Sequence, residues 1–214
     1  MTRSKSFDLK RHLPSTVFVL IILLVIAGFV GAFVYAGIYN IGADAPHSKL
    51  VYSALDTLRE RSIASYSRTI KAPADLSSPQ RISAGAGLYN EMCTGCHLGP
   101  GVEKSEISQG LYPLAPELAR GDDLTPAQQF WVIKHGVKLS AMPAWGKTHD
   151  NQLIWDMVAF LQALPQMSPR QYRAAVASAP VDHDEMMKDM AAMSDAHAST
   201  EKPQEHKHSH THPH

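Results

Sequence analysis

The stretch Cys93-Thr94-Gly95-Cys96-His97 decides how this chain is interpreted. The C-x-x-C-H pattern is the attachment signature of a c-type haem. Its two cysteines can form thioethers to the two vinyl groups of the porphyrin, and the histidine can then become the proximal iron ligand. These are the only two cysteines among 214 residues. The motif therefore predicts one covalently bound haem, held by Cys93, Cys96 and His97.

Two other kinds of site also use a C-x-x-C pair, namely a thioredoxin-like redox dithiol and half of a zinc site. A zinc ribbon needs a second cysteine pair, which this sequence lacks. A redox dithiol has no use for the histidine that follows Cys96. The haem interpretation is therefore favoured over both.

An uncharged apolar segment runs from Thr16 to about Tyr39 and is long enough to cross the hydrocarbon core of a membrane as a helix. The residues before it carry four basic side chains against one acid: Arg3, Lys5, Lys10 and Arg11 against Asp8. Basic residues tend to stay in the cytoplasm. We expect residues 1–15 to be cytoplasmic, residues 16–39 to form a transmembrane anchor, and the rest to lie in the periplasm.

A secretory signal peptide is the competing interpretation of this segment, because Ala43-Asp44-Ala45 resembles a cleavage site. The apolar run is longer than a signal h-region, and Pro46 would hinder cleavage. We therefore expect an uncleaved single-pass anchor in a bacterial inner membrane. Haem attachment on the outer face of that membrane agrees with this topology.

Residues 40–79 are predicted to form a helical spacer and a linker. Ser48 is a suitable N-cap for a helix over residues 47–71. An apolar stripe follows near the helical period: Leu50, Val51, Leu55, Leu58 and Ile63. This helix is either a spacer or docking element, or a helix packed on its own domain. A linker rich in serine and proline follows, from Pro73 to Pro79.

Three more helices are predicted from capping residues, apolar spacing and terminating glycine or proline residues. They cover about residues 79–92, 126–136 and 151–164. No segment shows strand alternation, so residues 80–166 are predicted to form a small all-α domain. A domain of this size buries little surface alone, so the haem is expected to supply part of its core.

Two further motifs lie around the C-x-x-C-H site. Gly85 and Tyr89 precede it on the first helix, and an aromatic-bearing segment, Met157-Val158-Ala159-Phe160-Leu161, lies on the last. The stretch GVKLSAMPAWG, residues 136–146, contains a Met-Pro step followed by an aromatic residue and a glycine. With these motifs, residues 80–166 resemble the class I (monohaem) cytochromes c.

The resemblance implies a small helical fold in which the first helix crosses the last at Gly85 and Tyr89. It also implies that His97 is the proximal iron ligand and Met142 the distal one. A thioether is a soft ligand that favours ferrous iron, so His/Met ligation raises the reduction potential. The sulfurs of Met92, Met157 and Met167 are less suitable by their positions in the chain.

Three other histidines were considered as ligands or surface groups. His135 is an alternative iron ligand, but it is expected to lie partly exposed at a helix C-terminus, where it interacts well with the dipole. His47 and His149 have no ligand context and are expected on the surface. The family also uses a proline carbonyl to accept the N–H of the proximal histidine. Pro116 resembles that proline, whereas Pro100 is nearer in sequence, and the choice stays open.

Residues 167–214 are expected to form a disordered tail rich in histidine and methionine. It contains His183, Met186, Met187, Met190, Met193, His197, His206, His208, His210, His212 and His214. Histidine with methionine would suit copper or another divalent metal, so weak metal capture and a plain solvating extension weigh equally.

These observations predict an electron-transfer protein, not an enzyme, unless it is a subunit of an oxidoreductase complex. The expected partners are membrane or periplasmic redox proteins, such as a quinol-oxidising cytochrome complex and a terminal oxidase or reductase. Residues 81–166 contain six Lys/Arg and eight Asp/Glu, so no nucleic-acid partner is expected. Two alternatives remain: a haem-based gas-binding or sensing protein, and a copper-handling protein that acts through the tail.

Overall fold

A computed structural model of the chain describes residues 15–180. Every regular element within these residues is a helix, which confirms the predicted all-α class. The chain divides into two compact units, residues 1–45 and residues 46–214. The predictions of a basic cytoplasmic N-terminus and of a metal-binding His/Met tail fall on residues 1–14 and 181–214, which lie outside the described residues.

The first unit contains helix α1, Thr16–Tyr35, whose N-terminus is capped by Ser15. The Ser15 hydroxyl accepts a hydrogen bond from the Phe18 backbone N–H at 3.2 Å. No side chain of α1 is buried, and among the described residues it is the one helix long and apolar enough to cross a membrane. The helix ends earlier than the predicted apolar segment, before Gly37 at φ +62°.

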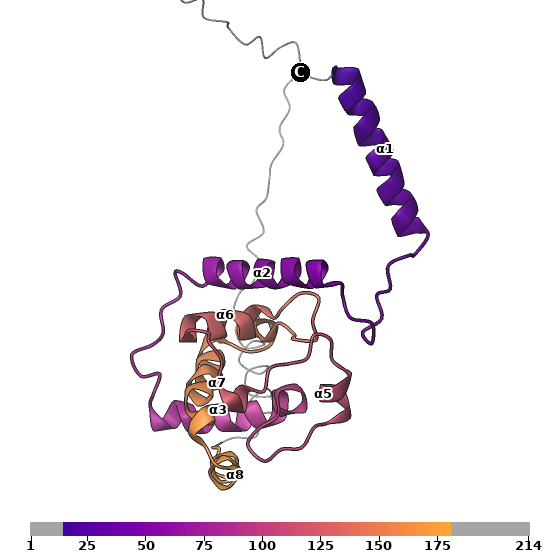
Figure 1. Cartoon of the computed structure of the whole chain (residues 1–214). Helices are drawn as coiled ribbons and strands as arrows, with labels where there is room; N and C mark the ends of the chain where they lie inside the picture. The colour runs from indigo at the N-terminus through magenta and orange to yellow at the C-terminus, as the bar shows by residue number, and fades with distance from the viewer. Residues whose placement is uncertain (1–14, 181–214) are drawn as a thin grey trace, which may run out of the picture. The chain divides into compact units, whose positions relative to one another are not determined.

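The second unit begins with α2, Lys49–Tyr66, which is capped by Ser48 as predicted. This helix packs on α6, Pro126–His135 (Figure 1). The Tyr66 and Trp131 rings stack with their centroids 5.9 Å apart, and Ile63 is buried. Of the two interpretations of α2, packing on its own domain is the one observed.

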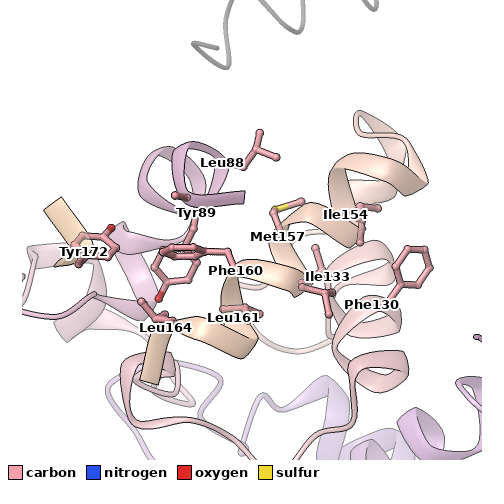
Figure 2. Close-up of a cluster of buried hydrophobic side chains, with 12 residues drawn as sticks. Leu88, Tyr89, Phe130, Ile133, Ile154, Met157, Phe160, Leu161, Leu164 and Tyr172 are labelled. Atoms are coloured by element: carbon pink, nitrogen blue, oxygen red, sulfur yellow. The ribbon is translucent and has the colours of Figure 1, made fainter. Parts of the chain in front are cut away.

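The centre of the second unit is the crossing of α3, Pro79–Met92, with α7, Asn151–Ala163. A Cβ atom on Gly85 would lie 2.0 Å from the Asp156 carbonyl oxygen, so only glycine allows this approach. Beside the crossing, the Tyr89 and Phe160 rings pack with centroids 5.4 Å apart (Figure 2). The crossing implied by the family resemblance is therefore present.

The hydrophobic core gathers around this crossing and includes α6 (Figure 2). The α6 helix begins with the predicted capping box of Thr125 and Gln128, and it ends before Gly136. From α6, Phe130 stacks on Trp155 of α7 at 4.3 Å between centroids. The largest fully buried side chains are Tyr89, Phe160, Leu88, Ile154, Met157, Leu164 and Val158.

A further helix, α8, covers Pro169–Ala177, after the short 3-10 helix η4, Leu164–Gln166. The predicted start of a disordered tail at residue 167 is therefore wrong. Ser168 and Gln171 form a capping box at its N-terminus. Tyr172 is 3% exposed, and its hydroxyl donates to Asn90 Oδ1 at 3.1 Å. These contacts order α8 against α3.

Candidate functional site

The three residues of the C-x-x-C-H motif lie on a single helical turn. Cys93 is the C-cap of α3 and also the N-cap of the short helix α4, Thr94–His97. The His97 backbone N–H donates to the Cys93 carbonyl oxygen at 2.8 Å. Because one turn carries both thiols and the imidazole, the motif is presented as one compact group.

The thiol environment weighs against a redox dithiol. Burial raises the pKa of Cys93 to about 12, and the neighbouring Cys96 adds to this shift. Reactive dithiols depend on a thiolate with a lowered pKa. Among residues 15–180, no three His, Cys, Asp or Glu side chains converge as zinc ligands would. The haem interpretation of the motif therefore stays the best supported.

The proximal candidate, His97, is held through its Nδ1 atom, which lies 2.9 Å from the Pro116 carbonyl oxygen. A carbonyl only accepts, so Nδ1 must be the donor, and Nε2 keeps its lone pair for a metal. The bond thus runs to Pro116 and not to Pro100. Burial lowers the pKa of His97, although the Pro116 bond and the charge of Asp122 act in the opposite direction. A neutral imidazole is the form that binds iron.

Hydroxyl groups fasten the loop that follows α4. The Tyr89 hydroxyl donates to the Leu98 carbonyl oxygen at 2.7 Å, and Leu98 has a left-handed φ of +59°. The Ser105 hydroxyl donates to the Gly95 carbonyl oxygen at 2.6 Å, just before the short helix α5, Glu106–Gly110. These bonds fix the backbone on which the motif lies.

The same loop is joined to the segment before α2. The His47 backbone N–H donates to the Tyr112 hydroxyl at 2.9 Å, and the two rings pack edge to face at 5.3 Å. Tyr112 is four residues from Pro116, the acceptor of the His97 proton. Nothing in the local sequence around His47 indicates this contact, because its partner lies 65 residues away.

Two other histidines, His135 and His149, differ in their exposure to solvent. His135 is exposed at the end of α6 and contacts the Trp131 ring at 5.1 Å. His149 was expected on the surface, and this is wrong: it is 5% exposed. The short 3-10 helix η3, Trp145–Lys147, places the Trp145 ring edge-on to His149 at 5.5 Å. His149 is therefore a packing residue of the loop that follows Met142.

The candidate distal ligand, Met142, is presented by a closed hydrogen-bonded loop. The Val137 N–H donates to the Met142 carbonyl oxygen at 3.2 Å. The Ser140 hydroxyl donates to the Val137 carbonyl oxygen at 2.7 Å and accepts the Met142 N–H at 3.2 Å. Gly136, at φ +65°, allows this closure because a Cβ there would lie 2.6 Å from the Met142 carbonyl oxygen. The role of Ser140 was not predicted.

The donor set and its surroundings fit an iron porphyrin. Cys93 and Met142 are both half-buried and pack against the same hydrophobic cluster. Between the motif and Met142, the loops carry exposed apolar side chains suited to contact with a large apolar group: Ile107, Leu114 and Leu139. Two thiols could attach to the porphyrin, and an imidazole with a free Nε2 and a thioether could ligate its iron, which is the set of groups that a class I cytochrome c would need.

Comparison with known families gave one finding. The sequence model described as "Cytochrome C oxidase, cbb3-type, subunit III" matches residues 80–161. No curated protein and no solved structure matched the chain.

Proposed function

We propose that this protein is a membrane-tethered one-electron carrier. The match of residues 80–161 to a c-type cytochrome model supports a domain of the kind that carries haem c and takes part in electron transfer. Haem c, when bound, supplies a reversible one-electron couple. The chain's own residues would bind it and would present His97 and Met142 to the iron. No other chemistry is assigned to the domain.

We assign four residues to a single covalently bound haem. Cys93 and Cys96 hold it through thioethers, His97 is the proximal ligand and Met142 the distal ligand. The observation that carries this assignment is the His97 Nδ1–Pro116 hydrogen bond of 2.9 Å, which leaves the lone pair of Nε2 free to bind iron. The hydrogen bonds that hold His97 and the Met142 loop would keep both side chains in place when haem is bound, and this would favour one-electron transfer with little rearrangement.

The proposal also covers the membrane anchor and the redox partners. Helix α1 is long and apolar enough to cross a membrane, and the basic N-terminal residues support a cytoplasmic N-terminus with the haem domain in the periplasm. Tethering raises the effective concentration of the domain near membrane redox complexes. The matching family is described as an oxidase subunit. A quinol-oxidising cytochrome complex is thus the proposed donor, and a terminal oxidase or reductase the proposed acceptor.

Two measurements on the detergent-extracted full chain test the proposal. Haem that stays with the polypeptide on a denaturing gel, and is lost in Cys93→Ser/Cys96→Ser, supports covalent attachment. The spectrum of the reduced protein should not change when carbon monoxide is added, because Met142 closes the sixth position. A large Soret shift would instead support gas binding or sensing. Co-purification with oxidase subunits would distinguish a fixed subunit from a mobile carrier.

A further inference from the structure

A groove lies beside the crossing of α3 and α7, and none of the residues assigned to the haem lines it. It has a volume of about 380 Å³ and is bounded by the segment before α3, by α3 and by the C-terminal half of α7. Its lining is mainly apolar: Leu76, Ser77, Ile82, Ala159, Gln162 and Ala163. Leu76 and Ile82 are only half-buried, whereas Ala159 is 1% exposed and forms the floor. Two apolar walls over a floor of small residues leave room for a partner side chain.

The described chain ends close to one wall of this groove. The Ser83 hydroxyl donates to the Ser178 carbonyl oxygen at 3.4 Å, at the C-cap of α8. Ser83 directly follows Ile82, which lines the groove. The last described residue, Pro180, follows Ser178 by two positions. Met186 lies six positions after Pro180, and at roughly 3.5 Å per residue these six steps span at most about 20 Å.

The sequence of that outgoing segment has the pattern needed to fill such a groove. Met186, Met190 and Met193 follow the i, i+4, i+7 spacing, which places three side chains on one face in helical register. Most of the neighbouring positions are acidic or small. Methionine is flexible and fills irregular apolar gaps well. Met187 lies about 100° away from Met186 and would not share that face.

We propose that residues 183–197 dock on their own domain, with Met186, Met190 and Met193 in the groove formed by Leu76, Ile82, Ala159 and Ala163. The chain's own segment is the occupant because it starts beside the groove and carries the matching apolar spacing. The proposal does not depend on the haem assignment. It gives the methionines of the tail a packing role in place of a metal-binding one.

The test uses the full-length, haem-loaded protein in detergent, produced with a photoactivatable methionine analogue. After illumination, monomeric protein should yield cross-links between residues 186–193 and peptides that contain residues 73–83 or 159–163. Ala163→Leu, which fills the groove, should reduce these cross-links at least roughly fivefold while the haem spectrum is unchanged. Met187→Ser is the matched control and should leave them unchanged.

The outcomes that overturn the proposal are specific. Cross-links confined to a dimeric band mean that a second copy occupies the groove. An absence of cross-links from residues 186–193 to either peptide means that the segment does not dock there. If Ala163→Leu fails to fold, Met186→Ser/Met190→Ser/Met193→Ser replaces it. Amide exchange in residues 73–83 should then be roughly threefold faster than in the wild type, and unchanged exchange contradicts the proposal.

Discussion

The Nδ1 atom of His97 donates to the Pro116 carbonyl oxygen across 19 residues of intervening chain. This N–H group needs a hydrogen-bond acceptor. The carbonyl group of Pro116, at the far end of the loop, provides it, and that of the nearer Pro100 does not. The orientation of the imidazole therefore depends on the path of the whole loop, including the contact between Tyr112 and His47. A change anywhere along this path should alter the iron centre before it alters the fold.

Replacing Met142 with alanine should open the sixth position. The half-buried thioether is removed, so the reduced Met142→Ala protein should bind carbon monoxide and its midpoint potential should fall. Visible spectra and a redox titration measure both effects. His135→Ala is the matched control: that imidazole is exposed at the end of α6, and its loss should leave the spectrum unchanged. A spectral change in His135→Ala alone would reverse the ligand assignment.

Removing the Ser140 hydroxyl should weaken the distal bond without removing the ligand. Ser140→Ala loses two hydrogen bonds that close the loop, each worth about 1 kcal/mol. We expect a weaker ferric charge-transfer band from the Met–iron bond and loss of that band at a lower pH. Ser140→Thr retains the hydroxyl and should restore both. A merely structural role would lower the unfolding temperature and leave the band intact.

Adding one methyl group at the helix crossing should be costly. In Gly85→Ala the new Cβ would overlap the Asp156 carbonyl oxygen, so α3 and α7 must separate, with a loss of about 3 kcal/mol or more. Denaturant unfolding measures this loss. Gly110→Ala, at the end of α5, meets no atom within 4 Å and should change stability by less than about 0.5 kcal/mol. If the two substitutions lowered the free energy of unfolding equally, the close approach of α3 and α7 at Gly85 would be contradicted.

The ion pair between Arg81 and Asp156 predicts a pH dependence. The Arg81 Nη1 and Asp156 Oδ1 atoms lie 2.6 Å apart, and both side chains are largely buried. Burial raises the pKa of Asp156, and Arg81 lowers it without cancelling that effect. The folded state thus holds this proton more tightly than the unfolded chain, and stability falls as the pH rises through the interval between the two pKa values.

Arg81→Met should widen that interval, because the pKa of Asp156 rises further when its cation is removed. We expect a loss of about 3 kcal/mol at pH 7 that becomes smaller in acid, where Asp156 takes up a proton. Urea unfolding at several pH values measures it. Arg59→Met removes a partly exposed pair with Asp56 and should cost less than about 1 kcal/mol at every pH. A loss independent of pH would mean that Asp156 is not the group responsible.

Substitutions of Tyr172 should show that α8 contributes to the stability of the domain. Tyr172→Phe removes the hydrogen bond to Asn90 and should cost about 1 kcal/mol. Tyr172→Ala also removes a buried ring and should cost about 3–5 kcal/mol. Both values come from denaturant unfolding of the full chain. If Tyr172→Ala matched the wild type, α8 would be an appendage of the domain and not a part of its core.

Local signals allowed most helix boundaries to be predicted. The caps at Ser48, Ser78 and Thr125 act within one turn, so a short window of sequence contains the whole cause. The α8 helix carries the same signal, Ser168-Pro169 followed by Gln171, although the composition of residues 167–214 predicts a disordered tail.

Contacts between distant segments were less predictable. Gly85 was placed at a helix crossing only through a family resemblance, and the choice of Pro116 over Pro100 required the path of the loop. The burial of His149 depends on the turn formed by Trp145, and no periodic pattern indicates it. The assignment of a covalent haem site depends on three residues within five positions of sequence, and it stays a prediction.

The hydrogen bond from His47 to Tyr112 also limits how far the domain can travel. Helix α1 ends at Tyr35, and the chain is fastened to the domain again at His47. Residues 36–46 are the tether between α1 and the domain. Fully extended, this tether reaches at most roughly 40 Å. If α1 spans a membrane, as proposed, a domain on so short a tether would not diffuse to a distant soluble partner. Its electron donor and acceptor would then lie in the same membrane or bind at the membrane surface.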